Sequence, residues 1–581
     1  MKKLFPIFAL AVFTLAVLAY NQNPKSNAKD NRILEANLFA ALDLDNKYIT
    51  NCGPGKFDFS EVNIKAPLLE GMGDHTFLVS NANSASQTYF NQGLNLTYGF
   101  NHTEAHRSFR EAATLSDKNA MAFWGQAYAL SPNINDANID LNRREKALEA
   151  ITLAMDRIDE VNDLERALIK ALKSRFIKDK DGSIIVDNET YRNEMATVAA
   201  KYKDNPDVLT LYAAAIMNTM PWDYWDRDMT PHNNTLEAKE ALEMAISINP
   251  RHPGAHHYYI HLTELPFPEL AAQSGDALAP LMPGAGHIVH MPSHAYVRVG
   301  RYFDAAVANM KAIKADEGYL SQCYAQGNYP LGYYPHNIHF LWYAATVMGD
   351  SKTAIAAARK TSEKVATGQL AQFEFMQEFA SIPIQAYVRF GQWNEILTIP
   401  YPGDNVKHMK LFWHYARGIA FIRKGLLDEA REELDALEII SKEASYDDIY
   451  ASLNSSGAIA DVAYNVVAGE YFAAKDAGDR ADKHFKAAIV SEDNLTYTEP
   501  PSWHLPVRHN YGAFLVDQKK YAEAEKIYKE DLNVFRNNGW SLIGLHSSYL
   551  GQGEESSAKE TMIRFEEAWQ YADIKISRSI Y

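Results

Sequence analysis

The sequence predicts an all-α protein in which antiparallel helix pairs stack along the chain as a solenoid. Its 581 residues are about four times a common domain size of roughly 150, which favours several domains or an extended repeat array. From residue 86 onward, amphipathic patterns of about 10 to 18 residues alternate with Pro, Gly and Asn-Asp turns. No sustained period-two pattern of the kind that marks β-strands interrupts them.

The clearest helix pair is predicted between His294 and Asp316. Its first helix ends at Gly300, Tyr302 follows in the turn, and small residues such as Ala305 allow close packing of the second helix. Tetratricopeptide (TPR) repeats use this arrangement, so the fold class is a TPR-like α-solenoid, a right-handed superhelix of helix pairs. Similar second-helix patterns occur at 102–115, 235–250, 425–437, 478–489 and 520–535.

Two interruptions divide the predicted array into three lobes. Residues 178–188 and 398–407 carry Gly, Pro, Asn and Asp in place of helical periodicity. The expected segments are an entry segment at 20–85, an N-terminal lobe at 86–177, a central His-rich lobe at 188–397 and a C-terminal lobe at 408–572.

The first nineteen residues resemble a secretory signal peptide. Lys2 and Lys3 precede an apolar run, Leu4 to Ala19, that ends in small residues. An uncleaved anchor is the alternative, but sixteen helical residues span only about 24 Å of a hydrocarbon core of about 30 Å. We therefore expect cleavage of 1–19, a periplasmic or secreted protein, and no stable membrane anchor afterwards.

Charge and cysteine content exclude several classes of protein. Asp and Glu number 73 against 57 Lys and Arg, a formal charge of -16, and no basic stripe offsets it, so nucleic acid is not an expected partner. Cys52 and Cys323 form no C-x-x-C pair, which excludes a zinc ribbon and a disulfide framework and leaves open whether the two are bridged. Motifs typical of metalloproteases, P-loop proteins, serine hydrolases and dinucleotide-binding domains are missing as well.

The histidines are not scattered at random. Nine of the nineteen lie between His252 and His339. Four pairs in the chain stand four residues apart, at 102/106, 252/256, 257/261 and 290/294, where chance predicts about 0.6. Four residues is about one helical turn, so both imidazoles of such a pair can reach one ion.

These spacings predict a transition-metal site on the concave wall of the solenoid. His257, His261, His290 and His294 are expected to converge on one ion of Zn, Cu, Fe or Ni, with His287 and His336 as nearby alternates. Glu264 could add a carboxylate, and binding should weaken as the pH falls through about 6.5, because only neutral imidazole is a ligand. Pro292, between His290 and His294, weakens the same-face argument. The alternative is that these histidines form hydrogen bonds in a packed inner wall.

A second candidate is the loop Pro221 to Asp228, which carries three aromatic and three acidic side chains. Such a composition could stack a sugar or hold calcium, and a buried plug is the alternative.

Several stretches resemble a family of exported bacterial TPR proteins over residues 86–550. They include MNTMPWDYW, RHPGAHHYYIHLTE, PGAGHIVHMPSHAYVRVGRYFDAAVAN and TYTEPPSWHLPVRHNYGAFL. The resemblance implies an α-solenoid and export, and it implies no reaction, cofactor or substrate. Leu265 to Pro268 departs from the family pattern, which puts the local geometry around Glu264 in question.

Two functions follow from these observations. The first is an exported binding or scaffold protein whose concave wall takes a peptide, a protein or a small ligand. The alternative is a metal-dependent enzyme or metal carrier built on the histidine cluster. The sequence leaves open whether the protein catalyses a reaction.

Overall fold

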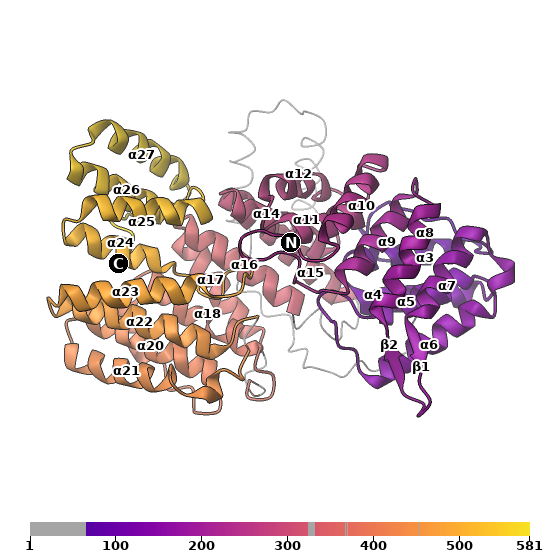
Figure 1. The fold of residues 1–581 in the computed structure, drawn as a ribbon, viewed down its shortest axis with the longest axis horizontal. Coiled ribbons are helices and arrows are strands. Elements are labelled where there is room, and N and C mark those ends of the chain that lie inside the picture. The colour runs from indigo at the N-terminus through magenta and orange to yellow at the C-terminus, as the bar shows by residue number, and fades with distance from the viewer. Residues whose placement is uncertain (1–64, 323–331, 366–367, 369, 451–452) are drawn as a thin grey trace, which may run out of the picture. The chain divides into compact units, whose positions relative to one another are not determined.

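The computed structural model describes residues 65–322, 332–365, 368, 370–450 and 453–581 (Figure 1). All of these belong to the second of two units in the chain, Asp45–Tyr581. The predicted signal segment 1–19, most of the entry segment 20–85, Cys52 and Cys323 lie outside the described residues. Among the helices that are described, none has both the length and the hydropathy needed to span a bilayer.

The described chain is all-α apart from one short hairpin, which confirms the predicted TPR-like α-solenoid class (Figure 1). Consecutive helices pack against each other through most of the chain, and short connections make such neighbours antiparallel. Up to the hairpin, the helices are α3 (Ser84–Tyr98), α4 (His102–Leu115), α5 (Ala120–Leu130), α6 (Leu141–Met155) and α7 (Asp163–Ser174).

Helix starts in this first part follow from the sequence. Asn83, Asn101, Asn119, Asp140 and Asn162 precede α3 to α7, and each side-chain oxygen accepts a hydrogen bond from a backbone N–H of the first turn. Asn and Asp are preferred at this position because they satisfy N–H groups that have no partner within the helix.

Glycines permit the close approach of α3, α4 and α5. A Cβ on Gly125 would lie 2.4 Å from the ring of Phe109, and one on Gly93 would lie 2.8 Å from it. Phe109 is fully buried between them. A large side chain set against glycines on both neighbouring helices is how this repeat interlocks.

The first predicted interruption contains a β-hairpin. Strands β1 (Phe176–Lys178) and β2 (Ile184–Val186) pair antiparallel, with Phe176 opposite Val186. Each strand has three residues, too few to show an alternating pattern in the sequence. The second interruption, at 399–406, joins α19 to α20 without regular structure. The division into three lobes remains a prediction.

The central helices carry the histidine-rich sequence. They are α8 (Asn188–Lys201), α9 (Pro206–Met217), α10 (Thr235–Ile248), α11 (Pro253–Thr263), α12 (Pro268–Leu278), α13 (Gly286–His290), α14 (Pro292–Arg298), α15 (Tyr302–Gln322), α16 (Tyr334–Val347), α17 (Ser351–Glu363), α18 (Met376–Arg389) and α19 (Trp393–Thr398). One apolar core takes its residues from Ala66 to Met291, together with Tyr319.

The C-terminal helices build a second core, from Ile384 to Ala558. They are α20 (Lys407–Arg423), α21 (Leu427–Ile440), α22 (Ser456–Ala474), α23 (Gly478–Asp493), α24 (Val507–Asp517), α25 (Tyr521–Val534), α26 (Gly539–Gln552) and α27 (Glu555–Ala568).

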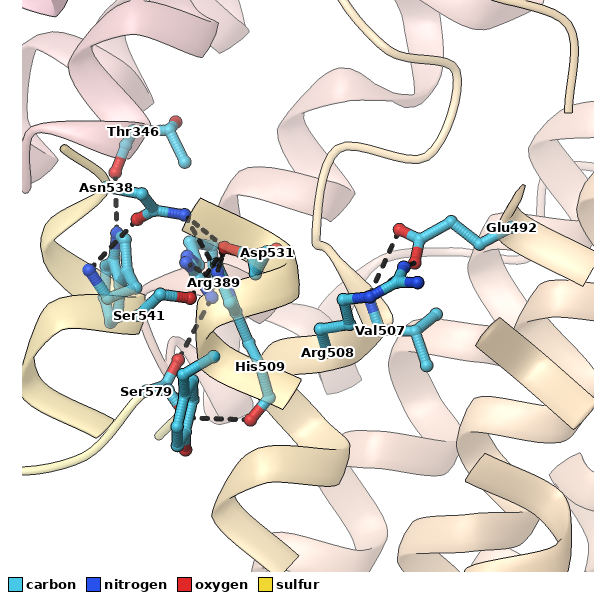
Figure 2. A network of polar contacts seen from close by, with 12 residues as sticks. Thr346, Arg389, Glu492, Val507, Arg508, His509, Asp531, Asn538, Ser541 and Ser579 are labelled. Atoms are coloured by element: carbon cyan, nitrogen blue, oxygen red, sulfur yellow. Dashed lines mark hydrogen bonds and ion pairs between the residues drawn. The ribbon is translucent and has the colours of Figure 1, made fainter. Parts of the chain in front are cut away.

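A buried polar network ties α18, α24, α25 and α26 together (Figure 2). Arg389 donates to His509 Nδ1 at 2.9 Å, so the remaining ring hydrogen of His509 points from Nε2 to Asp531 Oδ2 at 3.2 Å. Ser541 Oγ donates to the same carboxylate oxygen at 2.6 Å, and Ser579 Oγ donates to the His509 carbonyl at 2.7 Å. Every ring nitrogen of His509 has a partner, so this histidine is structural.

Candidate metal centre

Four helices bring the six predicted ligand histidines together. His257 and His261 lie on α11, His287 and His290 on α13, His294 on α14 and His336 on α16. The first five are at most 4% exposed, and His336 is half-buried. The histidines therefore lie between packed helices.

The first group joins α11 to α13. Nε2 of His257 lies 3.1 Å from Nε2 of His261, and one nitrogen of each of these rings and of His287 lies within 4.8 Å of the others. The ring of Phe100 packs against all three, with centroid distances of 4.3, 5.8 and 5.5 Å. An apolar ring of this kind shields the nitrogens from water.

The second group repeats this design one step along the chain. Nε2 of His290 lies 2.9 Å from Nε2 of His294, and His336 completes a set of three within 4.8 Å. Phe340 packs against these rings as Phe100 does against the first group, at 4.7, 4.6 and 5.2 Å.

Pro292 does not separate His290 from His294. Met291, between α13 and α14, keeps helical dihedral angles of φ -49° and ψ -37°. Pro292 occupies the first turn of α14, where its missing N–H is tolerated. The one-turn spacing of the two histidines therefore survives the proline.

The four histidines expected around one ion are divided between the two groups. The rings of His261 and His294 are the link, at a centroid distance of 5.5 Å. Glu264 lies between them, with Oε2 3.1 Å from His294 Nδ1 and 3.9 Å from His261 Nδ1. The geometry is that of two neighbouring three-histidine groups that share a carboxylate.

Hydrogen bonds fix which nitrogens face inward. His257 Nδ1 lies 2.5 Å from the carbonyl oxygen of Tyr98, and His290 Nδ1 lies 2.6 Å from Asn309 Oδ1. The Asn309 amide nitrogen donates to Ala305 O, so its oxygen is the atom that faces His290. Both acceptors require N–H at Nδ1, which leaves Nε2 of His257 and of His290 as bare lone pairs.

This arrangement leaves His294 with one hydrogen for two neighbours, the Nε2 atom of His290 and the carboxylate of Glu264. If the single hydrogen of a neutral His294 sits on Nε2, it serves His290, and Nδ1 is then a bare acceptor 3.1 Å from a carboxylate oxygen. If it sits on Nδ1, two bare Nε2 atoms face each other at 2.9 Å. His261 has the same choice, and Nδ1 of His261, Nδ1 of His294 and Glu264 Oε2 make no hydrogen bond. An added proton or a metal ion between the Nε2 atoms removes the conflict.

Burial keeps the imidazoles in the neutral form that a metal requires. It lowers the pKa of His257 and of His336 to about 3. Burial, reinforced by the neighbouring rings, also holds the pKa values of His261, His287 and His290 well below the ordinary range. A metal would therefore not have to displace protons from these rings at neutral pH.

A third group has a different character. His75 Nε2 and His252 Nε2 lie 2.8 and 3.2 Å from Asp207 Oδ1, and the Tyr98 hydroxyl donates to the same oxygen at 2.8 Å. His252 Nδ1 accepts from the backbone N–H of Ala255 as the cap of α11. Burial alone would raise the pKa of Asp207, but the two histidine hydrogen bonds outweigh it and lower that pKa. The carboxylate supplies the charge, so this group needs no ion.

The remaining predicted histidine pairs do not belong to these groups. His256 lies against Ser274 Oγ and the Pro250 carbonyl, so the 252/256 pair does not share a site. His339 pairs with His504, with 2.8 Å between their Nε2 atoms, and so lies outside the group that contains His336. His102 stacks on Phe100.

A cavity of about 430 Å³ opens beside the centre. His261 and Glu264 form one part of its wall, the loop 222–229 forms a second, and residues 492–503 form a third. Arg227 donates to Asn494 Oδ1 at 2.8 Å and so ties the second and third parts together. Trp225 Nε1 donates to the Leu262 carbonyl at 2.7 Å, which fixes the loop on α11. The aromatic–acidic loop of the sequence analysis is therefore a cavity wall.

Sequence reasoning did not identify Phe100, Phe340, Asn309 or the carbonyl of Tyr98. Phe340 lies four residues after His336, so helical spacing could have indicated it. Histidine spacing does not signal the other three. Tyr98 lies 159 residues before His257, Phe100 lies in the turn between α3 and α4, and Asn309 lies on α15, 19 residues after His290.

No protein-family model and no curated protein matches the chain. Among solved structures, the human IFIT1 dimer with m7Gppp-AAAA is 13% identical, with a TM-score of 0.32, and the match covers 78% of this chain and 91% of that one. The Cut9–Hcn1 hetero-tetramer of APC/C is 12% identical, with a TM-score of 0.27 and coverage of 84% and 74%. Likenesses this low carry no argument about what this chain binds. Its own helices define a TPR-like helical-repeat protein with a buried, carboxylate-linked histidine centre.

Proposed function

We propose that this protein is a metal-dependent enzyme or metal carrier that holds two first-row transition-metal ions. One ion is held by His257, His261 and His287, and the other by His290, His294 and His336. The observation that carries the proposal is the gathering of three imidazole nitrogens within 4.8 Å in each group, with the paired Nε2 atoms 3.1 Å apart in one group and 2.9 Å apart in the other. Three nitrogens bonded to one ion at about 2.1 Å lie roughly 3.3 to 3.6 Å apart, so little movement is needed.

The donor set narrows the choice of metal. Three imidazoles with one shared carboxylate suit Zn, Cu, Fe or Ni and disfavour Ca²⁺ and Mg²⁺, which prefer oxygen. The described residues of the centre include no thiolate. The Tyr98 carbonyl and Asn309 contact the outer nitrogens of His257 and His290, and such contacts fix the tautomer and orientation of metal-binding histidines.

Three ligands for each ion leave a coordination position for water or a substrate, which is typical of catalytic sites. The cavity supports a catalytic role, because His261 and Glu264 belong both to its wall and to the centre. A carrier would instead need a route by which the metal leaves.

Metal analysis tests the proposal. Protein purified without a histidine tag is to be analysed by inductively coupled plasma mass spectrometry, before and after separate loading with Zn²⁺, Cu²⁺, Ni²⁺ and Fe²⁺. We expect two equivalents per chain, and we expect replacement of His261 and His294 together by Ala to remove stoichiometric metal. Replacement of His408 and His484 by Ala, outside the centre, should not change the content. A folded wild-type protein that retains none of the four metals refutes the proposal.

A second candidate is a binding protein without metal, in which hydrogen bonds between neutral imidazoles join the histidine pairs. The cavity and the helical-repeat fold support it, because helical repeats commonly present surfaces for peptides, proteins or small ligands. In either case we propose that the protein acts outside the cytoplasm after removal of residues 1–19. N-terminal sequencing of the exported protein tests this, with a start close to Tyr20 expected.

A further inference from the structure

The cavity has the size and wall of a small-molecule site. Its volume of about 430 Å³ lies within the range of about 300 to 1,000 Å³ that such sites occupy. Its wall combines aromatic rings from Trp222, Trp225, Tyr497 and Trp503 with charged side chains from three separate parts of the chain.

Several polar atoms of wall residues make no hydrogen bond within the protein. They include Glu264 Oε2, Glu499 Oε2 and Trp503 Nε1, on side chains that are 2%, 4% and 3% exposed. A buried polar atom without a partner costs about 1 to 3 kcal/mol, so most such atoms in proteins are satisfied. Their concentration around one cavity indicates a polar ligand that supplies both donors and acceptors.

The charge of the wall argues against an anionic ligand. Six acidic side chains, Asp223, Asp226, Glu264, Glu492, Asp493 and Glu499, face three arginines. Burial raises the pKa of Glu499 to about 7 and that of Glu492 to about 8, so these carboxyl groups exchange between donor and acceptor roles near neutral pH. Phosphate-bearing ligands would meet net repulsion.

We infer that the cavity binds a neutral saccharide, whose hydroxyl groups meet the carboxyl and indole groups that lack hydrogen bonds and whose ring faces lie on Trp222 and Trp225. Sugar rings offer hydroxyl donors and acceptors around the edge and an apolar face, which matches flat aromatic side chains set among carboxylates. Trp222 and Trp225 are half-buried and so offer part of their surface to the cavity. The inference goes beyond the proposed metal centre and shares only His261 and Glu264 with it.

The wall also favours a compact ligand over a longer peptide. The three wall segments are tied to one another by Arg227 on Asn494 and by Trp225 on Leu262, and the space that they surround, about 430 Å³, has the size of a small-molecule site. A compact ligand fits this enclosure better than an extended chain does.

A glycan array tests the inference, followed by titration of the best binder into full-length protein monitored by tryptophan fluorescence. Chelator-treated and metal-loaded protein are to be compared. We expect neutral glycans to bind in both forms and glycans that carry phosphate, sulfate or uronate to bind weakly or not at all. Binding without metal would separate this inference from the metal proposal, because each can then fail alone. No binding of any neutral glycan, or a preference for acidic glycans or for an arrayed peptide, overturns it.

Two pairs of variants locate the site. Trp225→Phe and Glu499→Gln should each weaken binding by about tenfold to hundredfold, the loss expected for one hydrogen bond or ring contact to a buried ligand. Trp413→Phe is the matched control for Trp225, because Trp413 is also half-buried and donates from Nε1 to a loop carbonyl, that of Ile399, at 3.0 Å. Glu470→Gln is the control for Glu499, because Glu470 is buried and pairs with Arg423 away from the cavity. Equal effects of the variants and their controls would refute the location.

Discussion

The six-histidine centre and the His75–Asp207–His252 group lie close together, and we propose an ion only for the first. Tyr98 belongs to both, because its hydroxyl donates to Asp207 and its carbonyl faces His257. Gly254 allows this close approach, since a Cβ there would lie 2.5 Å from the Tyr98 ring. In the Asp207 group three donors meet one carboxylate oxygen, whereas in the centre the paired Nε2 atoms face each other and Nδ1 of His261 and of His294 makes no hydrogen bond. The comparison teaches that the count of available hydrogens, more than the number of histidines, separates a structural cluster from a candidate metal site.

The largest expected effect is on metal content, and it tests whether the centre consists of two separate groups. If it is two groups, His257→Ala should remove about one of two metal equivalents, and His290→Ala should remove the other, because loss of one of three ligands destroys a site. His75→Ala should leave both equivalents in place. Metal content per folded chain is the measurement. Loss of both metals in either single variant would show one coupled centre instead.

The next expected effect is on stability, and it concerns the His75–Asp207–His252 group. Asp207→Ala leaves two imidazoles and the Tyr98 hydroxyl without their acceptor, so we expect the free energy of unfolding to fall by about 3 to 5 kcal/mol. Metal content per folded chain should not change. Urea denaturation followed by circular dichroism measures the first quantity, and mass spectrometry measures the second. A stability loss below about 1 kcal/mol would contradict the view that Asp207 neutralises its group.

A smaller effect is expected at Glu264, the link between the two groups. Glu264→Gln removes the negative charge and offers an amide N–H to His294 Nδ1, which satisfies the metal-free state. We therefore expect the metal-free variant to be as stable as the wild type or more stable. We expect its metal affinity to be about tenfold to hundredfold lower, the loss typical when a group that hydrogen-bonds to a metal ligand is removed. Competitive chelator titration measures the affinity. Glu492→Gln, on the cavity wall away from the histidines, is the control.

The sequence was sufficient to predict the fold class and the histidine pairs. Helical spacing places His257 beside His261 and His290 beside His294 however the helices pack, because the spacing depends only on the local backbone. It could not predict that His287 joins the first pair and His336 the second. That depends on how α13 and α16 pack against α11 and α14, which is decided by contacts between segments far apart in the chain.

The cavity shows the same limit. The aromatic–acidic loop, Pro221 to Asp228, and the loop that begins at Glu499-Pro500-Pro501 were each unusual in sequence. They are too far apart along the chain for any sequence pattern to connect them. Arg227 and Asn494 make that junction in the structure. The unpartnered state of Glu499 and Trp503 is also a property of the assembled wall and not of either segment.

The smallest expected effect is a pH dependence that reports the charge of Asp207. Its pKa is lowered in the folded protein, whereas in the unfolded chain it is about 3.9. Below about pH 3.9 the unfolded state therefore binds more protons than the folded state, and stability falls as the pH falls, by at most about 1.4 kcal/mol per pH unit. Above that value the contribution of Asp207 to the free energy of unfolding is complete.

The difference in unfolding free energy between wild type and Asp207→Asn should thus be constant from pH 7 to 5 and should shrink below pH 4. Because both proteins contain the same other titrating groups, including the buried His408 and His504 with pKa values lowered by burial to about 3, their effects cancel in the difference. A difference that already changes between pH 7 and 5 would mean that the charge of this group resides on its histidines, and the contrast with the six-histidine centre would then disappear.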